Sequence, residues 1–241
     1  MTETGHMVFH YADEIFSLGA ELASRVKTGR IIVPALLAVG IVNSIPKLVA
    51  SRILQPVLKS DIPIRLVCRE GGLEALLGEL AVHQLDLVLS DKPIPSGLSV
   101  KAFSHAMGSS EIALFARKGT TRKYEKDFPH CLHEAPILLP TKDNPIRRAL
   151  DEWFDQEGIS PTLVAEFEDS ALMKAFGEAG NGIFPAPVAI SHEVEQMYHC
   201  RRIGSAIPVE EKYFAISPER KLKHPAVLKI IENARAHLLP R

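Results

Sequence analysis

Short apolar runs alternate with segments of helical spacing through the first third of the chain. The runs at 36–42, 64–68 and 85–90 have the length and β-branched content of buried strands, and helices are predicted between them at 46–58 and 73–83. Pro56 is expected to interrupt the first of these helices. Strands and helices that alternate in this way form parallel sheets with right-handed crossovers. The pattern therefore predicts an α/β fold.

The alternation breaks after residue 100 and then resumes. Two extended segments, 100–104 and 111–117, are predicted on either side of the small residues 106–110. A second series follows: strand 137–139, helix 145–157, strand 162–167, helix 170–179, a strand at 182–184 ended by Pro185 and Pro187, helix 188–198, a returning strand at 212–217, and a last helix starting at His224 and Pro225. Two crossings between two such series predict two interleaved α/β lobes with a hinged cleft. We assign 30–104 and 209–241 to lobe I and 105–208 to lobe II.

Residues 1–29 are predicted to form a helix that precedes lobe I. Its apolar residues recur every three or four positions, close to a heptad pattern: Val8, Tyr11, Ile15, Leu18, Leu22 and Val26. A polar segment ending at Gly29 stops the helix. The stripe predicts dimerisation through Tyr11, Ile15, Leu18 and Leu22, with packing against its own domain as the alternative.

The junction between strand 36–42 and the next helix is a candidate ligand site. Gly40 allows a close approach to the strand, and Pro46 suits the first helical turn. Asn43 and Ser44 then lie at a helix N-terminus, where free N–H groups can hold an anion or a water and side-chain oxygens can hold a cation. Simple capping of the helix by Asn43 and Ser44 is the alternative.

Ligands of such sheets bind beyond the carboxyl ends of the strands, so we collected the polar residues of those loops. The candidate ligand-binding residues are Asn43, Ser44, Glu70, Ser90, Asp91, Thr141, Asp143, Asn144, Asp169, Ser170 and Gly180. The same residue types also form turns and cap helices, and that is the alternative for each of them.

Composition narrows the function classes. The chain has 241 residues, 46% of them hydrophobic, with 28 Lys and Arg against 29 Asp and Glu and a net charge of −1. This balance, with no long block of like charge, argues against a nucleic-acid-binding face. The cysteines, Cys68, Cys131 and Cys200, are widely spaced and are expected to be reduced thiols. With neither a signal peptide nor an 18-residue apolar run, we expect a cytoplasmic protein with no membrane association.

Catalytic motifs are missing from the sequence. It contains no G-x-S-x-G elbow, P-loop or dinucleotide fingerprint, so we expect no catalytic residue and no cofactor. His6 with His10, and His130 with His133, have spacings that could bind zinc, but each pair lacks a third ligand and no metal site is expected. Cys68 is expected to be a small buried hydrophobe, with a ligand contact or a redox role as the alternative. The adjacent acids Glu210 and Glu211 are expected to be solvated.

Several segments together resemble LysR-type transcriptional regulators. Residues 2–5 with Tyr11–Ile15 resemble the end of the wing and the linker helix of that family, and Asp169–Leu172 with Gly180–Pro185 are similar to its second-lobe motif. The resemblance implies the two-lobe fold of type 2 periplasmic binding proteins, a homodimer or higher oligomer, and a small effector, cation or anion, between the lobes. It places Ser44, Thr141 and Asp169–Ser170 at the effector.

The family resemblance also implies partners. It places helix 46–58 of one subunit near helix 170–179 of another. The winged helix-turn-helix that precedes the linker helix in the family is absent here. We therefore expect the chain to be a fragment, or a gene product that lacks this domain, and we expect contact with DNA only through such a domain.

Three segments, Gly40–Ala50, Arg65–Glu70 and Leu85–Pro93, resemble more narrowly the sodium-responsive members of the family that activate sodium/proton antiporter genes. That resemblance implies sodium or lithium as the signal. Such a cation needs several oxygen ligands, for which Ser44, Asp91, Asp143, Asp169 and backbone carbonyls are the candidates; an organic anion at the helix N-terminus is the alternative. The competing functions are a free-standing solute-binding protein and an enzyme of the porphobilinogen-deaminase-like or prephenate-dehydratase-like lobed folds.

Overall fold

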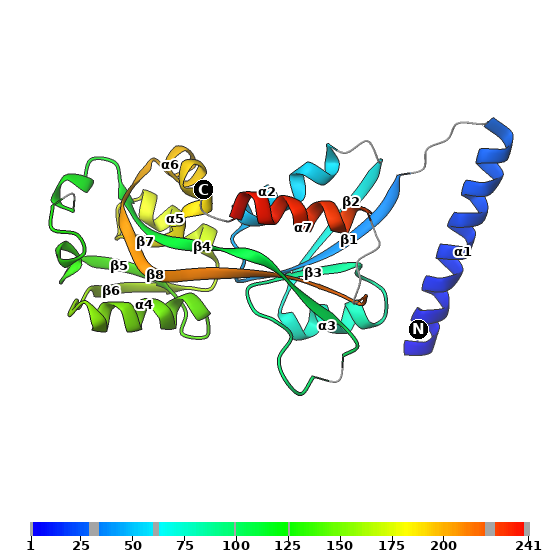
Figure 1. Ribbon diagram of the computed structural model, residues 1–241, viewed down its shortest axis with the longest axis horizontal. Coiled ribbons are helices and arrows are strands. Elements are labelled where there is room, and N and C mark those ends of the chain that lie inside the picture. Colours follow the sequence, from blue (N-terminus) through cyan, green and yellow to red (C-terminus); the bar gives the residue numbers. More distant parts are fainter. Residues whose placement is uncertain are drawn as a thin grey trace.

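The computed structural model describes residues 2–28, 34–59, 63–98, 100–124, 126–219 and 225–238. Helix α1, Glu3–Thr28, lies outside the two lobes that form the rest of the molecule (Figure 1). Gly29, the predicted end of this helix, and His224, the predicted cap of the last helix, fall outside the described residues.

Lobe I is a parallel α/β unit, as the alternating pattern predicts. Its elements are β1 Ala35–Val42, α2 Lys47–Leu58, β2 Ile64–Gly71, α3 Leu73–Ala81, β3 Leu87–Ser90 and α7 Pro225–Leu238. Strand β1 pairs in parallel with both β2 and β3. Figure 1 shows α2 and α7 together on one side of this sheet and α3 on the other. The carboxyl ends of all three strands consequently face the same edge.

Lobe II contains a smaller parallel pair and the second set of helices. Its elements are β5 Pro136–Pro140, α4 Pro145–Gln156, β6 Thr162–Phe167, α5 Ser170–Glu178, β7 Phe184–Pro187 and α6 Ser191–Met197, with short 3-10 turns at Thr121–Lys123, His130–Leu132 and Val188–Ile190. Strand β5 pairs in parallel with β6, while β7 pairs antiparallel with β4. The predicted helix 188–198 is thus a 3-10 turn followed by a shorter α-helix.

Two long antiparallel strands, β4 Phe103–Arg117 and β8 Cys200–Ser217, run through both lobes and join them. The sequence predicted separate extended segments at 100–104 and 111–117, and a strand only from 212. Instead, β4 is continuous and bends at a bulge between Ala106 and Gly108, where Gly108 has a φ of 145°. The six-stranded sheet has the order β2-β1-β3-β8-β4-β7. The assigned lobe boundaries at 104/105 and 208/209 lie within these two strands.

Two predictions about prolines were wrong. Pro56 does not interrupt α2. A proline at this position leaves the carbonyl of Arg52 without its helical N–H donor, and Asn233 on α7 replaces that donor through Nδ2 at 3.0 Å. The predicted strand at 182–184 is instead β7, Phe184–Pro187, in which Pro185 is an interior residue and only Pro187 is at the end. Proline is tolerated there because β7 is the edge strand of its sheet.

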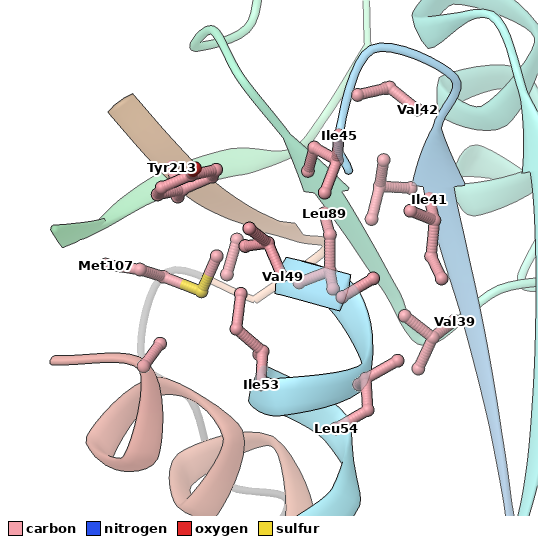
Figure 2. Close-up of a cluster of buried hydrophobic side chains, with 14 of the residues drawn as sticks. Val39, Ile41, Val42, Ile45, Val49, Ile53, Leu54, Leu89, Met107 and Tyr213 are labelled. Carbon is pink, nitrogen blue, oxygen red and sulfur yellow. The ribbon is translucent and has the colours of Figure 1, made fainter. Parts of the chain in front are cut away.

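The apolar faces of these elements bury a core at the hinge. Figure 2 shows Ile53 of α2 between Val39 and Ile41 of β1 on one side and Met107 of β4 and Tyr213 of β8 on the other, all within one buried cluster. A separate cluster in lobe II surrounds Trp153 of α4. Gly40 faces this lobe I packing rather than a ligand, since a Cβ there would lie 2.8 Å from Leu85 Cδ1. No helix in the described part of the chain is long and apolar enough to cross a membrane.

Candidate functional site

A polar cavity of about 240 Å³ lies between the two lobes. Lobe I contributes the loops after β1, β2 and β3, and lobe II contributes the loops after β5 and β6. The lining residues are Val42, Asn43, Ser44, Gly71, Gly72, Leu73, Asp91, Lys92, Thr141, Asp143, Asn144, Pro145 and Glu168. Six predicted residues from distant parts of the sequence, Asn43, Ser44, Asp91, Thr141, Asp143 and Asn144, therefore meet in one cavity.

Helices from both lobes begin at this cavity. Some of the candidate residues cap these helices and others do not. The Asn144 side chain caps α4 by accepting from Ile146 N at 2.9 Å, and Asp169 caps α5 by accepting from Ala171 N at 2.5 Å. Asn43 and Ser44 have no such role, because α2 starts at Lys47 with Pro46 as N-cap and no side-chain capping bond. Capping, the alternative proposed for Asn43 and Ser44, is therefore excluded.

Asp91 has an unusual position in the cavity wall. Its side chain is only 9% exposed, and among the described residues Oδ1 has no hydrogen-bond partner. The neighbouring Ser90 is fully buried and shapes the turn, since its Oγ donates to Lys92 O at 2.7 Å. A buried carboxylate oxygen without a donor is costly, so Asp91 is the residue here that most requires a ligand or a water.

Acidic side chains outnumber basic ones around the cavity. Asp91, Asp143 and Glu168 carry the negative charges of the lining, against the single positive charge of Lys92. A hydrogen bond from Thr141 holds the pKa of Asp143 below its usual range, so this carboxylate stays ionised at neutral pH. The positive ends of the helix dipoles alone would favour an anion in the cavity, and the negative charges of these acidic side chains counteract that preference.

A second, smaller cavity of about 30 Å³ adjoins the first and shares Ser44 and Asn144 with it. Ser170 and the buried side chains of Lys174 and Glu211 line it. Lys174 Nζ donates to Ser170 O at 3.0 Å, and burial lowers the pKa of its ammonium to about 8. This compartment has room for one or two waters or a single small group.

Glu211 corrects the sequence-based expectation of a solvated acid pair. Glu210 is exposed, but Glu211 is only 5% exposed, because alternate residues of β8 point to opposite faces of the sheet. Tyr213, fully buried, donates through its hydroxyl to Glu211 Oε2 at 2.5 Å. Burial raises the pKa of Glu211 to about 7. Sequence reasoning missed Lys174, Glu211 and Tyr213; the period-two alternation after residue 209 was the one available signal.

Other candidates lie away from the cavity lining. Glu70 forms an exposed ion pair with Lys47. Gly180 lies past the opposite end of α5, against Arg117, because its loop precedes β7 instead of following a strand. Gly180 is not among the residues that line either cavity, and its contact with a ligand stays a prediction. Cys68 is exposed on β2 rather than buried.

Within the described segments, no group of three or more His, Cys, Asp or Glu residues is placed to hold a metal ion. His130 and His133 accordingly belong to no such group, and the side chains of His6 and His10 lie outside the described ones. The acids Asp91, Asp143 and Asp169 do not form a three-carboxylate cage either.

Two lobes joined by two crossing strands, with a polar cavity between them, are features that known proteins share. Residues 35–239 match the family model described as "LysR substrate binding domain". The chain belongs to the LysR family. A likeness to a solved putative LysR family transcriptional regulator from Pseudomonas aeruginosa, with a TM-score of 0.64 at 16% identity over 99% of this chain and 82% of that one, agrees in fold. This family has the periplasmic-binding-protein-like α/β fold that the sequence predicted.

Relatives of known name support the same assignment. The transcriptional activator protein NhaR of Escherichia coli K12 is 35% identical over 229 residues, which cover 95% of this chain and 75% of that protein. A RuBisCO operon transcriptional regulator of Acidithiobacillus ferrooxidans is 27% identical over 67% of this chain and 52% of that protein. The effector-binding domain of QuiR, solved with shikimate, matches 86% of this chain and 98% of its own with a TM-score of 0.60 at 13% identity. The first two of these relatives are named as regulators of transcription, and none of the three is named as an enzyme.

Proposed function

We propose that this chain is the effector-sensing and dimerising region of a LysR-type transcriptional activator of the cytoplasm. The polar cavity between the lobes carries the proposal, because side chains from both lobes line it. A ligand that contacts both lobes stabilises the arrangement in which they are closest, and so shifts the population of lobe angles. Contact with DNA would come through a winged helix-turn-helix joined to α1, and no membrane is involved.

The proposed effector contacts are the residues that line the two compartments. Asn43, Ser44 and Asp91 act from lobe I, and Thr141, Asp143, Asn144 and Ser170 act from lobe II. The remaining predicted residues support them: Glu70 holds Lys47 beside the start of α2, Ser90 shapes the turn before Asp91, and Asp169 caps α5. We retain residues 1–29, 30–104 with 209–241, and 105–208 as the functional division of the chain.

The apolar stripe of α1 supports dimerisation. Tyr11, Ile15, Leu18 and Leu22 are between 50% and 66% exposed. Aliphatic side chains that recur at heptad spacing and remain this exposed are typical of a coiled-coil seam that a second helix covers. A second contact between copies is supported by Leu172 and Phe176, exposed one turn apart on α5, and by Leu58, exposed on α2.

Charge substitution in the stripe tests dimerisation. We expect Ile15→Asp combined with Leu18→Asp to lower the sedimentation coefficient from that of a dimer towards that of a monomer, while the circular dichroism of the lobes is retained. Ser17→Asp, a charge added at an exposed position off the stripe, is the matched control and should remain dimeric. Unchanged sedimentation of the double variant would contradict the role of α1.

Sodium or lithium as the signal, with antiporter genes as the target, is the finer proposal. It is supported by the identity to NhaR and by the acidic lining of the cavity. Since no cluster of three acids is present among the described residues, such an ion would be held by Asp91 together with hydroxyl and main-chain oxygens.

The test joins this chain to the DNA-binding region of the E. coli NhaR in a strain that lacks its own copy. A reporter gene under an antiporter promoter should respond to NaCl and LiCl and not to KCl at the same ionic strength. A chimera that accumulates, dimerises and stays silent with sodium would refute the sodium proposal and leave the effector-sensing proposal intact.

A further inference from the structure

Three charged side chains are buried together at the hinge between the lobes. Asp91 follows β3, Lys174 lies on α5, and Glu211 lies on β8, with exposed fractions of 9%, 2% and 5%. Burial of a net charge is strongly unfavourable unless something compensates it. Two acids and one base leave one negative charge over when all three are ionised.

Both acids interact with the buried phenol of Tyr213. Strand β3 pairs antiparallel with β8 so that Ser90 lies opposite Phe214, which places Asp91 next to Tyr213. The Tyr213 hydroxyl donates to Glu211 Oε2. Asp91 and Glu211 each raise the pKa of Tyr213, and Asp91 raises that of Glu211, so the two acids interact electrostatically. A single phenol proton cannot neutralise two carboxylates.

The groups that face Glu211 come from every neighbouring element. Lys174 of α5 attracts its charge, and Ser110 lies opposite it on β4. Lys174 does not form a direct ion pair with any carboxylate of the described residues, and its hydrogen bond goes to Ser170 O. Asp169, the cap of α5, acts on the same ammonium. Glu211 therefore has one distant positive neighbour and one negative neighbour.

Asp91 adds an independent observation that points to a ligand. Its buried Oδ1 has no partner in the described part of the protein, and its side chain lines the interlobe cavity. A donor or a cation placed in the cavity would satisfy this oxygen. An anion would approach it against like charge, and against Asp143 and Glu168.

We propose that the cavity takes a monovalent cationic group at Asp91 Oδ1 and that Glu211 releases a proton to solvent when this group binds. The proposal rests on the proposed function; it specifies the class of ligand and the dependence of ligand binding on pH. The buried charge balances in both states. Without ligand, Asp91 and Lys174 cancel while Glu211 is a neutral acid. With ligand, the O–H bond of Glu211 breaks and its proton passes to solvent. The carboxylate that remains balances the positive charge of the ligand.

Proton and ligand therefore compete. Since burial places the pKa of Glu211 near neutrality, about 7, the exchange falls within the physiological range. At pH 7 about half of the molecules hold this proton, so about half a proton is released per cation bound, and the apparent affinity rises about tenfold between pH 6 and pH 8. An alkali ion and a primary ammonium share the required chemistry.

The experiment measures protons directly. The protein is held at pH 7 in a weakly buffered, sodium-free solution with an indicator dye, and NaCl, LiCl or ethanolamine hydrochloride is added. Choline chloride, whose nitrogen has no N–H and is shielded by methyl groups, corrects for ionic strength. We expect saturable proton release with the alkali ions or with ethanolamine. The probe that saturates the release at the lower concentration shows whether the natural ligand is an alkali ion or a primary ammonium compound.

Two variants and a control assign the atoms. Asp91→Asn should raise the saturating concentration at least tenfold. Glu211→Gln keeps the shape and can still accept from Tyr213, but it cannot supply the second negative charge. At pH 8 it should bind the cation at least tenfold more weakly than the unmodified protein, with no proton release and no dependence of the affinity on pH. Glu210→Gln, the same change at the exposed neighbouring position of β8, lies outside both cavities and should retain proton release close to that of the unmodified protein.

The outcomes separate this inference from the proposed function. Cation binding without proton release, equal release from Glu211→Gln, or binding of acetate in place of the cations would overturn the exchange. If those results came with a dimer whose lobes close on an anion or a neutral ligand, the effector-sensing function would stand. A monomer that bound no small molecule would count against the proposed function itself.

Discussion

Replacing Glu211 by glutamine should change how the stability of the protein depends on pH. The folded-state pKa of Glu211 is about 7, above the ordinary value of 4.5, because the side chain is buried. The folded protein keeps this proton over a range in which the unfolded chain has lost it. The free energy of unfolding therefore falls as pH rises from about 4.5 to about 7, and this part of the stability is fully present only below that range.

The size of the effect follows from the pKa difference. A rise from 4.5 to about 7 corresponds to about 3 kcal/mol, at roughly 1.4 kcal/mol per pH unit. Glutamine is never charged, so Glu211→Gln avoids this loss. It also removes the attraction of Glu211 for Lys174, which offsets part of the gain. Relative to the unmodified protein, we expect the variant to gain about 1 to 3 kcal/mol between pH 5 and pH 8.

Urea denaturation at constant ionic strength, at half-unit steps from pH 5 to pH 8, measures this difference. Glu210→Gln, the same change at the exposed neighbouring position of β8, is the matched control and should parallel the unmodified protein. If the Glu211 and Glu210 variants both gave curves parallel to the unmodified protein, Glu211 would be ionised in the folded state throughout, and the charge balance argued for the hinge would be wrong.

Further predictions concern packing and backbone hydrogen bonds. Gly177→Ala in α5 should lower the free energy of unfolding by about 1 to 3 kcal/mol in thermal denaturation, because the added Cβ would lie 2.1 Å from the Phe184 ring. The control Gly78→Ala in α3 adds a Cβ that meets nothing within 4 Å and should raise the free energy of unfolding by about 0.5 to 1 kcal/mol. Equal effects of the two changes would contradict the packing of Gly177 against Phe184. Asn233→Ala removes the donor to Arg52 O beside Pro56 and should cost about 1 to 2 kcal/mol. Pro56→Ala in that background restores a helical N–H and should recover part of the loss; if it recovers none, Asn233 does not compensate for the proline. Arg52→Ala breaks the contacts from α2 to Ala189 O and Glu193 across the lobes, and should speed amide exchange at 188–190 more than Arg69→Ala, which breaks an exposed pair within lobe I.

Local patterns gave the order of the elements and most of the cavity. Strands β1, β2, β5 and β6 and helices α2 to α5 could be located because apolar periodicity is a property of neighbouring residues. The topology rule for parallel strands then placed Asn43, Ser44 and Asp91 at the carboxyl edge of the lobe I sheet and Thr141 at that of the lobe II sheet, and these two edges face one cavity. The rule does not extend to Gly180, because the loop that contains this residue precedes β7 and lines neither of the two cavities.

Only the tertiary structure decided which polar side chains are buried. The alternation of Val209, Glu211 and Tyr213 is the one local feature that distinguishes Glu211 from Glu210, and the burial itself depends on β3, β4 and α5, which are remote in the chain. The continuity of β4 and β8 across the hinge, and the tolerance of Pro56 and of the prolines in β7, likewise depend on partners or on edge positions set by distant segments. Secondary structure follows from short-range periodicity, whereas desolvation and electrostatic coupling depend on every group within several ångströms in space. The sequence by itself therefore determined the two-lobe architecture and the loops of the cavity, and folding alone determined the charge balance at the hinge.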